Sequence, residues 1–203
     1  KRNFIETLLS KNKKLKKFIK MITWYRGTKR LKKAAFSTSY DTVWCAGPSI
    51  EGVKSIRPVK KVVSELNHLL NHSLKIEITS SNNYNSELII TDNKWFKTHI
   101  KHSNPKANGY VSVWYNHKNV INKSKILISS QLDSKRKEHV IREELTQSLG
   151  ILKDSYMYKN SIFYQGYSTK TKFSDEDKKV IQTLYQQDIL PGMNRFEVLN
   201  TII

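Results

Sequence analysis

Apolar residues recur at the spacing of one helix face in separate stretches of the chain. Residues 58–70 carry the pattern at Val59, Val62, Val63, Leu66, Leu69 and Leu70. Residues 139–152 and 174–187 show the same periodicity, and Ser174 with Asp177 has the arrangement of a capping box. The pattern predicts a helix in each of these stretches.

Alternation of apolar and polar residues, which is typical of half-buried strands, appears between these stretches. It is clearest in residues 74–78 and 109–115, while short apolar runs at 42–45, 88–90 and 126–128 look like buried strands. Strands and helices in this order predict an α+β domain. We place the domain at residues 41–203.

Charge separates the first part of the chain from this domain. Residues 1–40 contain thirteen Lys or Arg against one acidic residue, which gives +12 of the net charge of +19. Apolar residues recur at helical spacing among these lysines, so residues 1–40 are predicted to form a basic amphipathic arm. The arm either binds an anionic membrane surface or polymer through residues 1–33, or packs its apolar stripe onto the domain.

Several features are missing from the sequence. No run of eighteen apolar residues occurs, so we expect no helix that spans a bilayer. Cys45 is the only cysteine, which rules out an internal disulfide. No phosphate-binding loop, dinucleotide fingerprint or named nucleic-acid-binding motif is present. We therefore expect no cofactor and no nucleic-acid partner for the domain.

The candidate chemistry lies in residues 139–150, HVIREELTQSLG. Their spacing matches the frame H-E-x-x-H-x-x-G, in which two His one helical turn apart bind zinc and the Glu polarises a metal-bound water. Glu143 stands at the first His position and Gln147 at the second. Glu144 stands at the position of the catalytic Glu, and Gly150 is in register, where it would let the chain turn sharply. The frame is present, but both zinc-binding His are replaced.

Two interpretations of these carboxylates remain open. A Gln amide is a poor zinc ligand and Lys153 occupies the place of a third His, so we expect no bound zinc. Glu143 and Glu144 either act as acid, base or hard-metal ligands, or hold the fold by bonding Arg142, Lys153 or backbone donors. His139 and Glu143 also have the spacing of a ligand pair, although such pairs are usually plain surface contacts. We favour the structural role, in which Glu144→Gln would cost on the order of 1–3 kcal/mol.

The segments after residue 150 continue an ordered pattern. Ser161-Ile162-Phe163-Tyr164 matches S-I-M-x-Y with Phe163 in place of Met, and the following helix begins at a capping Ser and ends at Leu184-Tyr185. This order resembles the metzincin clan of metallopeptidases. A closer match is a proteobacterial family of uncharacterised domains that is similar to a degenerate metzincin. Its motifs correspond to Arg142-Glu143-Glu144, Gln147, Leu149-Gly150-Ile151, Asp154-Ser155, Ser161-Ile162-Phe163, Leu184-Tyr185 and Pro191-Gly192-Met193. The resemblance covers residues 41–195 and is strongest from residue 139 onward.

The resemblance implies a metzincin-like fold, with a twisted mixed sheet that backs two long helices and a further C-terminal helix. It also implies a location in the envelope of a Gram-negative bacterium, either periplasmic or secreted. Metzincin grooves bind extended chains along an edge strand, which residues 110–115 or 126–129 could supply. We expect a peptide or protein partner in this groove, in contact with Glu143, Glu144, Gln147, Asp154, Phe163, Tyr164 and Tyr167.

Two alternatives belong to other functional classes. One is a hydrolase in which Glu143 and Glu144 are the catalytic residues and act with water or a hard cation. The other is a protein whose basic arm binds anionic lipid, glycan or nucleic acid. The loss of the zinc-ligand frame favours a non-catalytic binding domain over both.

Overall fold

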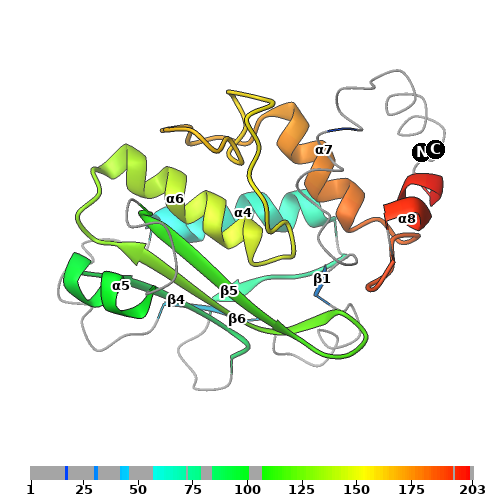
Figure 1. Ribbon diagram of the computed structural model, residues 1–203, viewed down its shortest axis with the longest axis horizontal. Coiled ribbons are helices and arrows are strands. Elements are labelled where there is room, and N and C mark those ends of the chain that lie inside the picture. Colours follow the sequence, from blue (N-terminus) through cyan, green and yellow to red (C-terminus); the bar gives the residue numbers. More distant parts are fainter. Residues whose placement is uncertain are drawn as a thin grey trace.

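The computed structural model describes residues 17, 30–31, 42–45, 57–71, 73–78, 84–100, 107–193 and 195–201. In chain order its elements are β1 (Arg30–Leu31), β2 (Thr42–Cys45), α4 (Arg57–Leu70), β3 (Glu77–Ile78), β4 (Ser86–Thr91), α5 (Asn93–His99), β5 (Gly109–Tyr115), β6 (Val120–Ser129), α6 (Ser134–Gln147), α7 (Asp175–Leu184) and α8 (Arg195–Thr201) (Figure 1). Apart from residue 17 and β1, the basic arm predicted for residues 1–40 lies outside the described residues.

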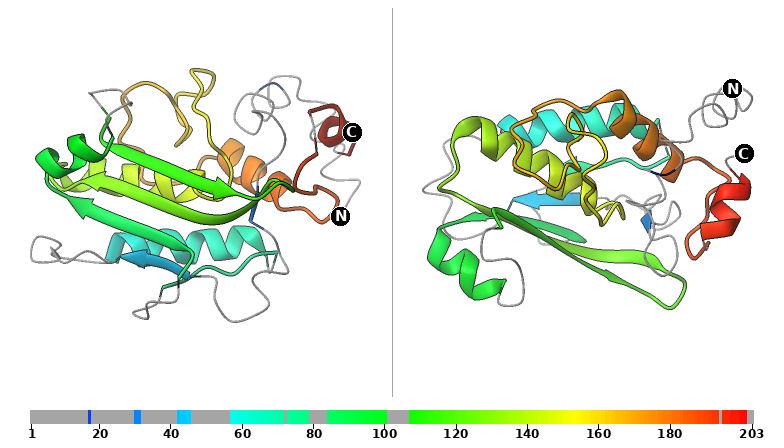
Figure 2. Two further views of the ribbon diagram at one scale, coloured as in Figure 1. Left: turned by 60° about the horizontal axis from the view of Figure 1, so that its bottom comes forward. Right: turned by 45° about the horizontal axis from the view of Figure 1, so that its top comes forward.

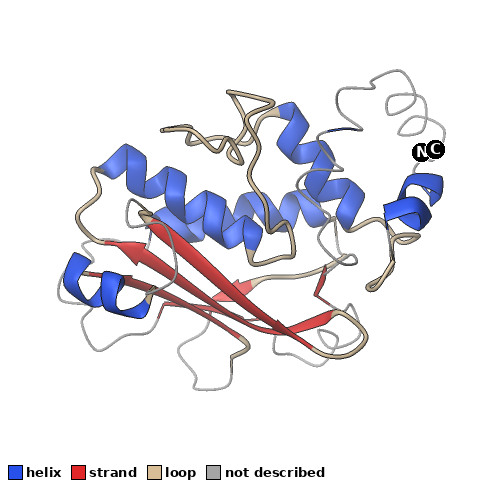
Figure 3. Cartoon of the chain, in the orientation of Figure 1, coloured by secondary structure: helices blue, strands red, loops and turns tan. Residues whose placement is uncertain are grey.

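The strands form a mixed six-stranded sheet, which agrees with the predicted α+β class (Figure 3). Its order is β1-β6-β4-β2-β3, with β5 paired to β6. All neighbouring strands run parallel except β5 and β6, which are antiparallel. Within the described chain β5 pairs only with β6, so β5 is an edge strand, as are β1 and β3, and β6 is interior. The prediction that residues 110–115 form an edge strand is therefore confirmed. The alternative, an edge at residues 126–129, is wrong, because these residues lie in the interior strand β6.

Helices α4, α6 and α7 lie on one face of the sheet (Figures 1 and 2). Side-chain alternation along β6 divides the apolar residues between the two faces. Ile126 and Ile128 join the main core with residues of α4 and α6, whereas Leu127 joins a second cluster with Phe96 of α5. No helix in the described part of the chain is long and apolar enough to cross a membrane.

Helix α6 is shifted toward the N-terminus relative to its prediction at 139–152. It begins at Ser134 because the Asp133 carboxylate accepts a hydrogen bond from the Arg136 N–H (3.0 Å) and caps the first turn. The first turn is polar and charged, so apolar periodicity could not reveal it. The helix ends at Gln147, and Gly150 has φ of 112°, a conformation that favours glycine. The sharp turn expected at Gly150 is confirmed.

Helix α7 has the predicted capping box. The Ser174 hydroxyl accepts from the Asp177 N–H (3.1 Å), and the Asp177 carboxylate accepts from the Ser174 N–H (2.8 Å). The helix ends at Leu184 rather than at residue 187, and Tyr185 is its C-cap.

Candidate functional site

Helix α6 is buried around most of its circumference. The predicted core residues Ile141, Leu145 and Leu149 are each at most 1% exposed. Polar residues of the same helix are buried as well: His139, Arg142, Glu144, Thr146 and Gln147. Buried polar groups require partners. The interactions of these residues therefore decide what the helix can do.

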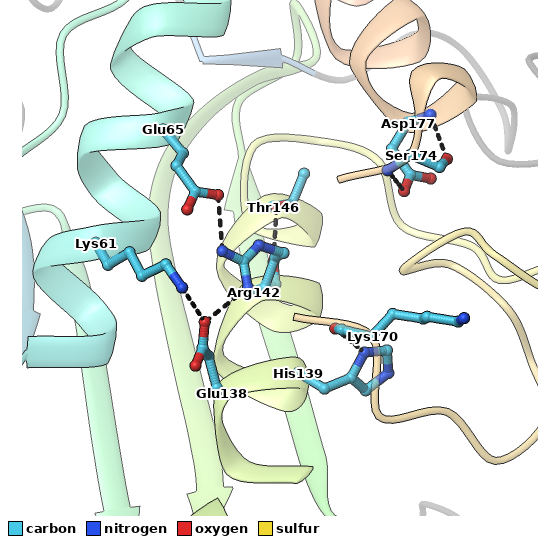
Figure 4. A network of polar contacts seen from close by, with 9 residues as sticks. All are labelled: Lys61, Glu65, Glu138, His139, Arg142, Thr146, Lys170, Ser174 and Asp177. Carbon is cyan, nitrogen blue, oxygen red and sulfur yellow. Dashed lines mark hydrogen bonds and ion pairs between the residues drawn. The ribbon is translucent and has the colours of Figure 1, made fainter. Parts of the chain in front are cut away.

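Arg142 joins α6 to α4 (Figure 4). Its side chain is fully buried, and its guanidinium donates to the Glu65 carboxylate (2.7 Å) and to the Glu138 carboxylate (3.4 Å). The guanidinium carbon also lies 5.1 Å from the centre of the Phe173 ring. Glu138 receives a further bond from Lys61 on α4 (2.7 Å). Arg142 thus pairs with carboxylates on the α4 side and not with its neighbours Glu143 and Glu144.

The segment at residues 167–170 is hydrogen-bonded to the start of α6. The His139 Nδ1–H donates to the Lys170 carbonyl (2.8 Å). Arg136 donates to the Ser168 carbonyl, and its guanidinium carbon lies 5.2 Å from the centre of the Tyr167 ring. Both residues of α6 therefore hold the loop in place through its backbone carbonyls.

Asp177 holds the preceding part of the loop. Its buried carboxylate accepts from the Ser161 hydroxyl (2.5 Å) and the Ile162 N–H (3.1 Å), besides the capping bond from Ser174. Desolvation raises the pKa of Asp177, and these bonds oppose that shift. Phe163 is fully buried. A direct contact between Phe163 and a bound partner does not fit this position, because the phenyl ring belongs to the core.

The other expected aromatic contacts lie nearer the surface. Tyr164 is half-buried and packs edge-on against Tyr156, with ring centres 5.9 Å apart. Tyr167 is 77% exposed. These side chains remain available to a partner, whereas Phe163 supports the loop from beneath.

Three carboxyl groups gather where α6 meets the loop. Gln147 donates to the Asp154 carboxylate (2.7 Å), which links the end of α6 to the loop. Burial raises the pKa of Asp154 to about 6 despite this bond. Burial and the charge of Asp154 raise the pKa of Glu144 to about 8, although Arg136 opposes the shift. Burial, Glu144 and Asp154 raise the pKa of Glu143 as well.

The sequence suggested cationic or backbone donors for these carboxyls. Within the described chain the Glu144 carboxyl has no hydrogen-bond donor, although the residue is only 7% exposed. Glu143 has one of its oxygens 3.4 Å from His139 Nε2, a buried atom without a hydrogen-bond partner. Burial lowers the pKa of His139 to about 4, so the ring is neutral near pH 7. Among the described residues Arg136 is a cation that acts on Glu144, and no hydrogen bond to its carboxyl is seen, so the expectation that cationic or backbone donors hold Glu144 stays a prediction.

The zinc frame does not reassemble around these residues. The amide nitrogen of Gln147 bonds to Asp154, and the Lys153 position is exposed. Among the described residues, no group of three or more His, Cys, Asp or Glu is placed to hold a metal ion. The residues present do not fit a zinc site of the peptidase kind.

The edge strand β5 begins directly against Glu144. A Cβ placed on Gly109 would lie 2.4 Å from Glu144 Oε1 and 2.5 Å from Val140 Cγ1. Real Cβ atoms essentially never approach other atoms to less than 3.0 Å. Only glycine fits there without movement of α6 or β5. No local pattern predicts this contact, because Gly109 is more than thirty positions from Val140 and Glu144 along the chain.

The structure brings together most of the residues expected to form the site. Glu143, Glu144, Gln147 and Asp154 form one cluster, and Tyr167 is tied to the start of the same helix through Arg136. Sequence reasoning missed three contributors: Arg136, Gly109 and the second nitrogen of His139. Their roles depend on contacts between distant segments, and no local motif marks them.

Comparison with known proteins identifies a family but no characterised relative. No curated protein matches the chain. The model of one family, described as protein of unknown function (DUF2927), matches residues 50–202 and thus includes α4, the sheet from β3 onward and all of the carboxyl cluster. Because this match covers well over half of the 203 residues, the chain belongs to the DUF2927 family.

Proposed function

We propose that this domain is a non-catalytic, metzincin-like domain of the bacterial cell envelope that binds an extended peptide or protein segment along β5. The observation that carries the proposal is the position of β5, an edge strand whose first residue touches the Glu144 side chain. The envelope location and the metzincin comparison rest on the motif resemblance.

The backbone of β5 is oriented to accept another strand. The Ser129 N–H donates to the Asn108 carbonyl (3.0 Å), directly opposite it in the β5–β6 register. Backbone groups alternate along an antiparallel strand, so the next odd-numbered residues direct their N–H and C=O away from β6. These residues are Gly109, Val111 and Val113. An unpaired edge of this kind binds extended peptides by adding a strand to the sheet.

The elements around β5 favour the binding of a peptide at this edge. Figure 1 shows α6 between β5 on one side and the 151–173 loop on the other. The side chains of Val111 and Val113 pack toward the core, on the same side as α6. A segment added to β5 would therefore run beside the carboxyl cluster.

The experiment uses short randomised peptides displayed on phage, selected against the purified full chain. Val111→Pro should weaken the selected peptides by about tenfold or more, because it removes an outward N–H while leaving the β5–β6 ladder bonds. Val111→Ala is the matched control, since it also loses packing but keeps the N–H. Equal binding by the two variants, at similar melting temperatures, would rule out strand addition at β5.

A second candidate function is hydrolysis by the carboxyl groups. It is favoured by the raised pKa of Glu144, because a carboxyl that holds its proton near pH 7 can serve as a general acid beside an ionised Asp154. The test is hydrolysis of peptide and glycan substrates by the wild type and by Glu144→Gln. Activity that disappears in a folded Gln variant would replace the binding proposal with this one. Trace-metal analysis of the same samples should find no stoichiometric zinc.

A further inference from the structure

We propose that β5 selects an extended segment with Lys or Arg at the residue paired with Gly109, and that this cation binds against Glu144, Glu143 and Asp154. The inference rests on the proposed function, because it assumes a strand added to β5. The inference names the chemistry of the partner at one position. Three observations support it: the position of Gly109, the gathering of three carboxyl groups, and acceptors without hydrogen-bond donors among the described residues.

The register brings one partner residue to Glu144. Directly opposite residues of neighbouring strands project their side chains on the same face, with Cβ atoms roughly 4.5–5.5 Å apart. The Cβ direction at Gly109 leads to Glu144 Oε1, only 2.4 Å from where that Cβ would be. A residue paired with Gly109 therefore projects its side chain toward the same carboxyl. Because Gly109 has no side chain, nothing on β5 blocks a long basic side chain from reaching it.

The cluster has more negative charge than local cations can neutralise. Arg136 is the cation that acts on both Glu143 and Glu144, and it is already bound to the Ser168 carbonyl. The Arg142 guanidinium is engaged by Glu65 and Glu138 on the α4 side.

Two acceptors of the cluster, on His139 and Glu144, have no hydrogen-bond donor in the part of the chain that the structure describes. His139 donates from Nδ1 to the Lys170 carbonyl, which leaves Nε2 as an acceptor. That atom is buried without a hydrogen-bond partner and lies 3.4 Å from a Glu143 oxygen. Glu144, a buried residue, also has no hydrogen-bond donor to its carboxyl among the described residues. An ammonium or guanidinium supplies several donors and a positive charge, which are the features that this cluster lacks.

Proton release should accompany such binding. In the free domain, burial and the charge of Asp154 raise the pKa of Glu144 to about 8, and burial and its neighbours raise the pKa of Glu143. A bound cation favours the ionised forms, so it displaces protons and binds more tightly as the pH rises toward 8. The affinity of a peptide with an uncharged side chain at the same position should not increase with pH in this way.

The test begins with the phage-selected peptides and their sequences. We expect Lys or Arg to be enriched at one fixed position. The net charge of +19 would by itself attract acidic peptides, so long-range attraction cannot produce this enrichment. The strongest peptide is then synthesised in two forms, one with the basic residue and one with norleucine in its place.

Both peptides are titrated against the wild type and Glu144→Gln. Norleucine should weaken binding to the wild type by about tenfold or more, and by much less to Glu144→Gln. Binding of the basic peptide to the wild type should also strengthen between acidic and mildly alkaline pH. Selected peptides that require the Val111 N–H but show no basic preference, or an equal norleucine penalty in both proteins, would overturn the inference and leave the proposed function intact. Failure to select any peptide, or insensitivity to Val111→Pro, would overturn both.

Discussion

Replacing Glu144 with Gln should stabilise the folded domain, and the gain should increase with pH. Among the described residues no group donates a hydrogen bond to this carboxyl, and burial together with Asp154 raises its pKa from 4.5 to about 8. The folded state therefore binds more protons than the unfolded state between these two values. The stability that this group allows is present below pH 4.5 and is lost as the pH rises through 8. Gln has a similar volume and does not titrate.

The size of the effect follows from the same linkage. Each pH unit between the two pKa values costs the wild type about 1.4 kcal/mol of unfolding free energy. At pH 7 the accumulated cost is on the order of 3 kcal/mol, most of which Glu144→Gln should remove. Near pH 4.5 the two proteins should differ little, because Glu144 is then protonated in the folded state and half protonated in the unfolded state. The His139 contribution, which has the opposite sign, cancels in the comparison.

The assay is urea unfolding of the wild type and Glu144→Gln, followed by circular dichroism across the mildly acidic to mildly alkaline range. Asp188→Asn is the control, because it removes an exposed carboxylate outside the cluster. A Gln variant that is less stable than the wild type at pH 7 would refute the reasoning. A difference that does not vary with pH would refute it as well, since either result means that donors anchor the carboxylate.

Three further predictions concern the contacts that build the site. Arg142→Met should lower the unfolding free energy by about 3–5 kcal/mol, because it leaves the Glu65 carboxylate without its cation and removes the link between α4 and α6. An unchanged urea midpoint would contradict this. Asp177→Asn should cost about 1–3 kcal/mol for each donor left unpaired and should increase protease cleavage within the 151–173 loop, whereas intact loop protection would argue against the anchoring role. Gly109→Ala should cost about 1–3 kcal/mol through overpacking, while Ser112→Ala on the same strand should cost less, and equal thermal shifts would show that α6 does not press on β5.

Local sequence patterns were sufficient for most of the elements. Helix α4 was predicted at 58–70 and observed at Arg57–Leu70, because an apolar stripe of 3.6-residue period must be buried on one side. The capping box of α7 and the turn at Gly150 depend on a few neighbouring residues, and both were predicted correctly. The charged start of α6 was missed, since its signal is a single Asp cap and not an apolar stripe.

The candidate site was only partly predictable. The frame at residues 139–150 placed Glu143, Glu144 and Gln147 on one helix, and the loop motif added Asp154. The sequence could not show which carboxylates Arg142 pairs with, because Glu65 is 77 positions away along the chain. From the sequence, Glu144→Gln is expected to destabilise the domain, whereas the desolvated position of Glu144 in the fold predicts the opposite sign. A glutamate anchored by donors and one buried without them have the same local sequence.

The amino-acid sequence by itself determined the α+β class, helices α4, α6 and α7 with most strands, and the loss of the zinc-binding histidines, whereas α5 and α8 were not predicted. Each of these depends on periodicity or on residue chemistry within a short window. Tertiary structure alone decided that β5 is an edge strand, that Gly109 lies against Glu144, and that burial raises the pKa of the cluster carboxyls. Pairing order, close contact and desolvation arise between segments that meet only in the folded chain, so no local pattern encodes them.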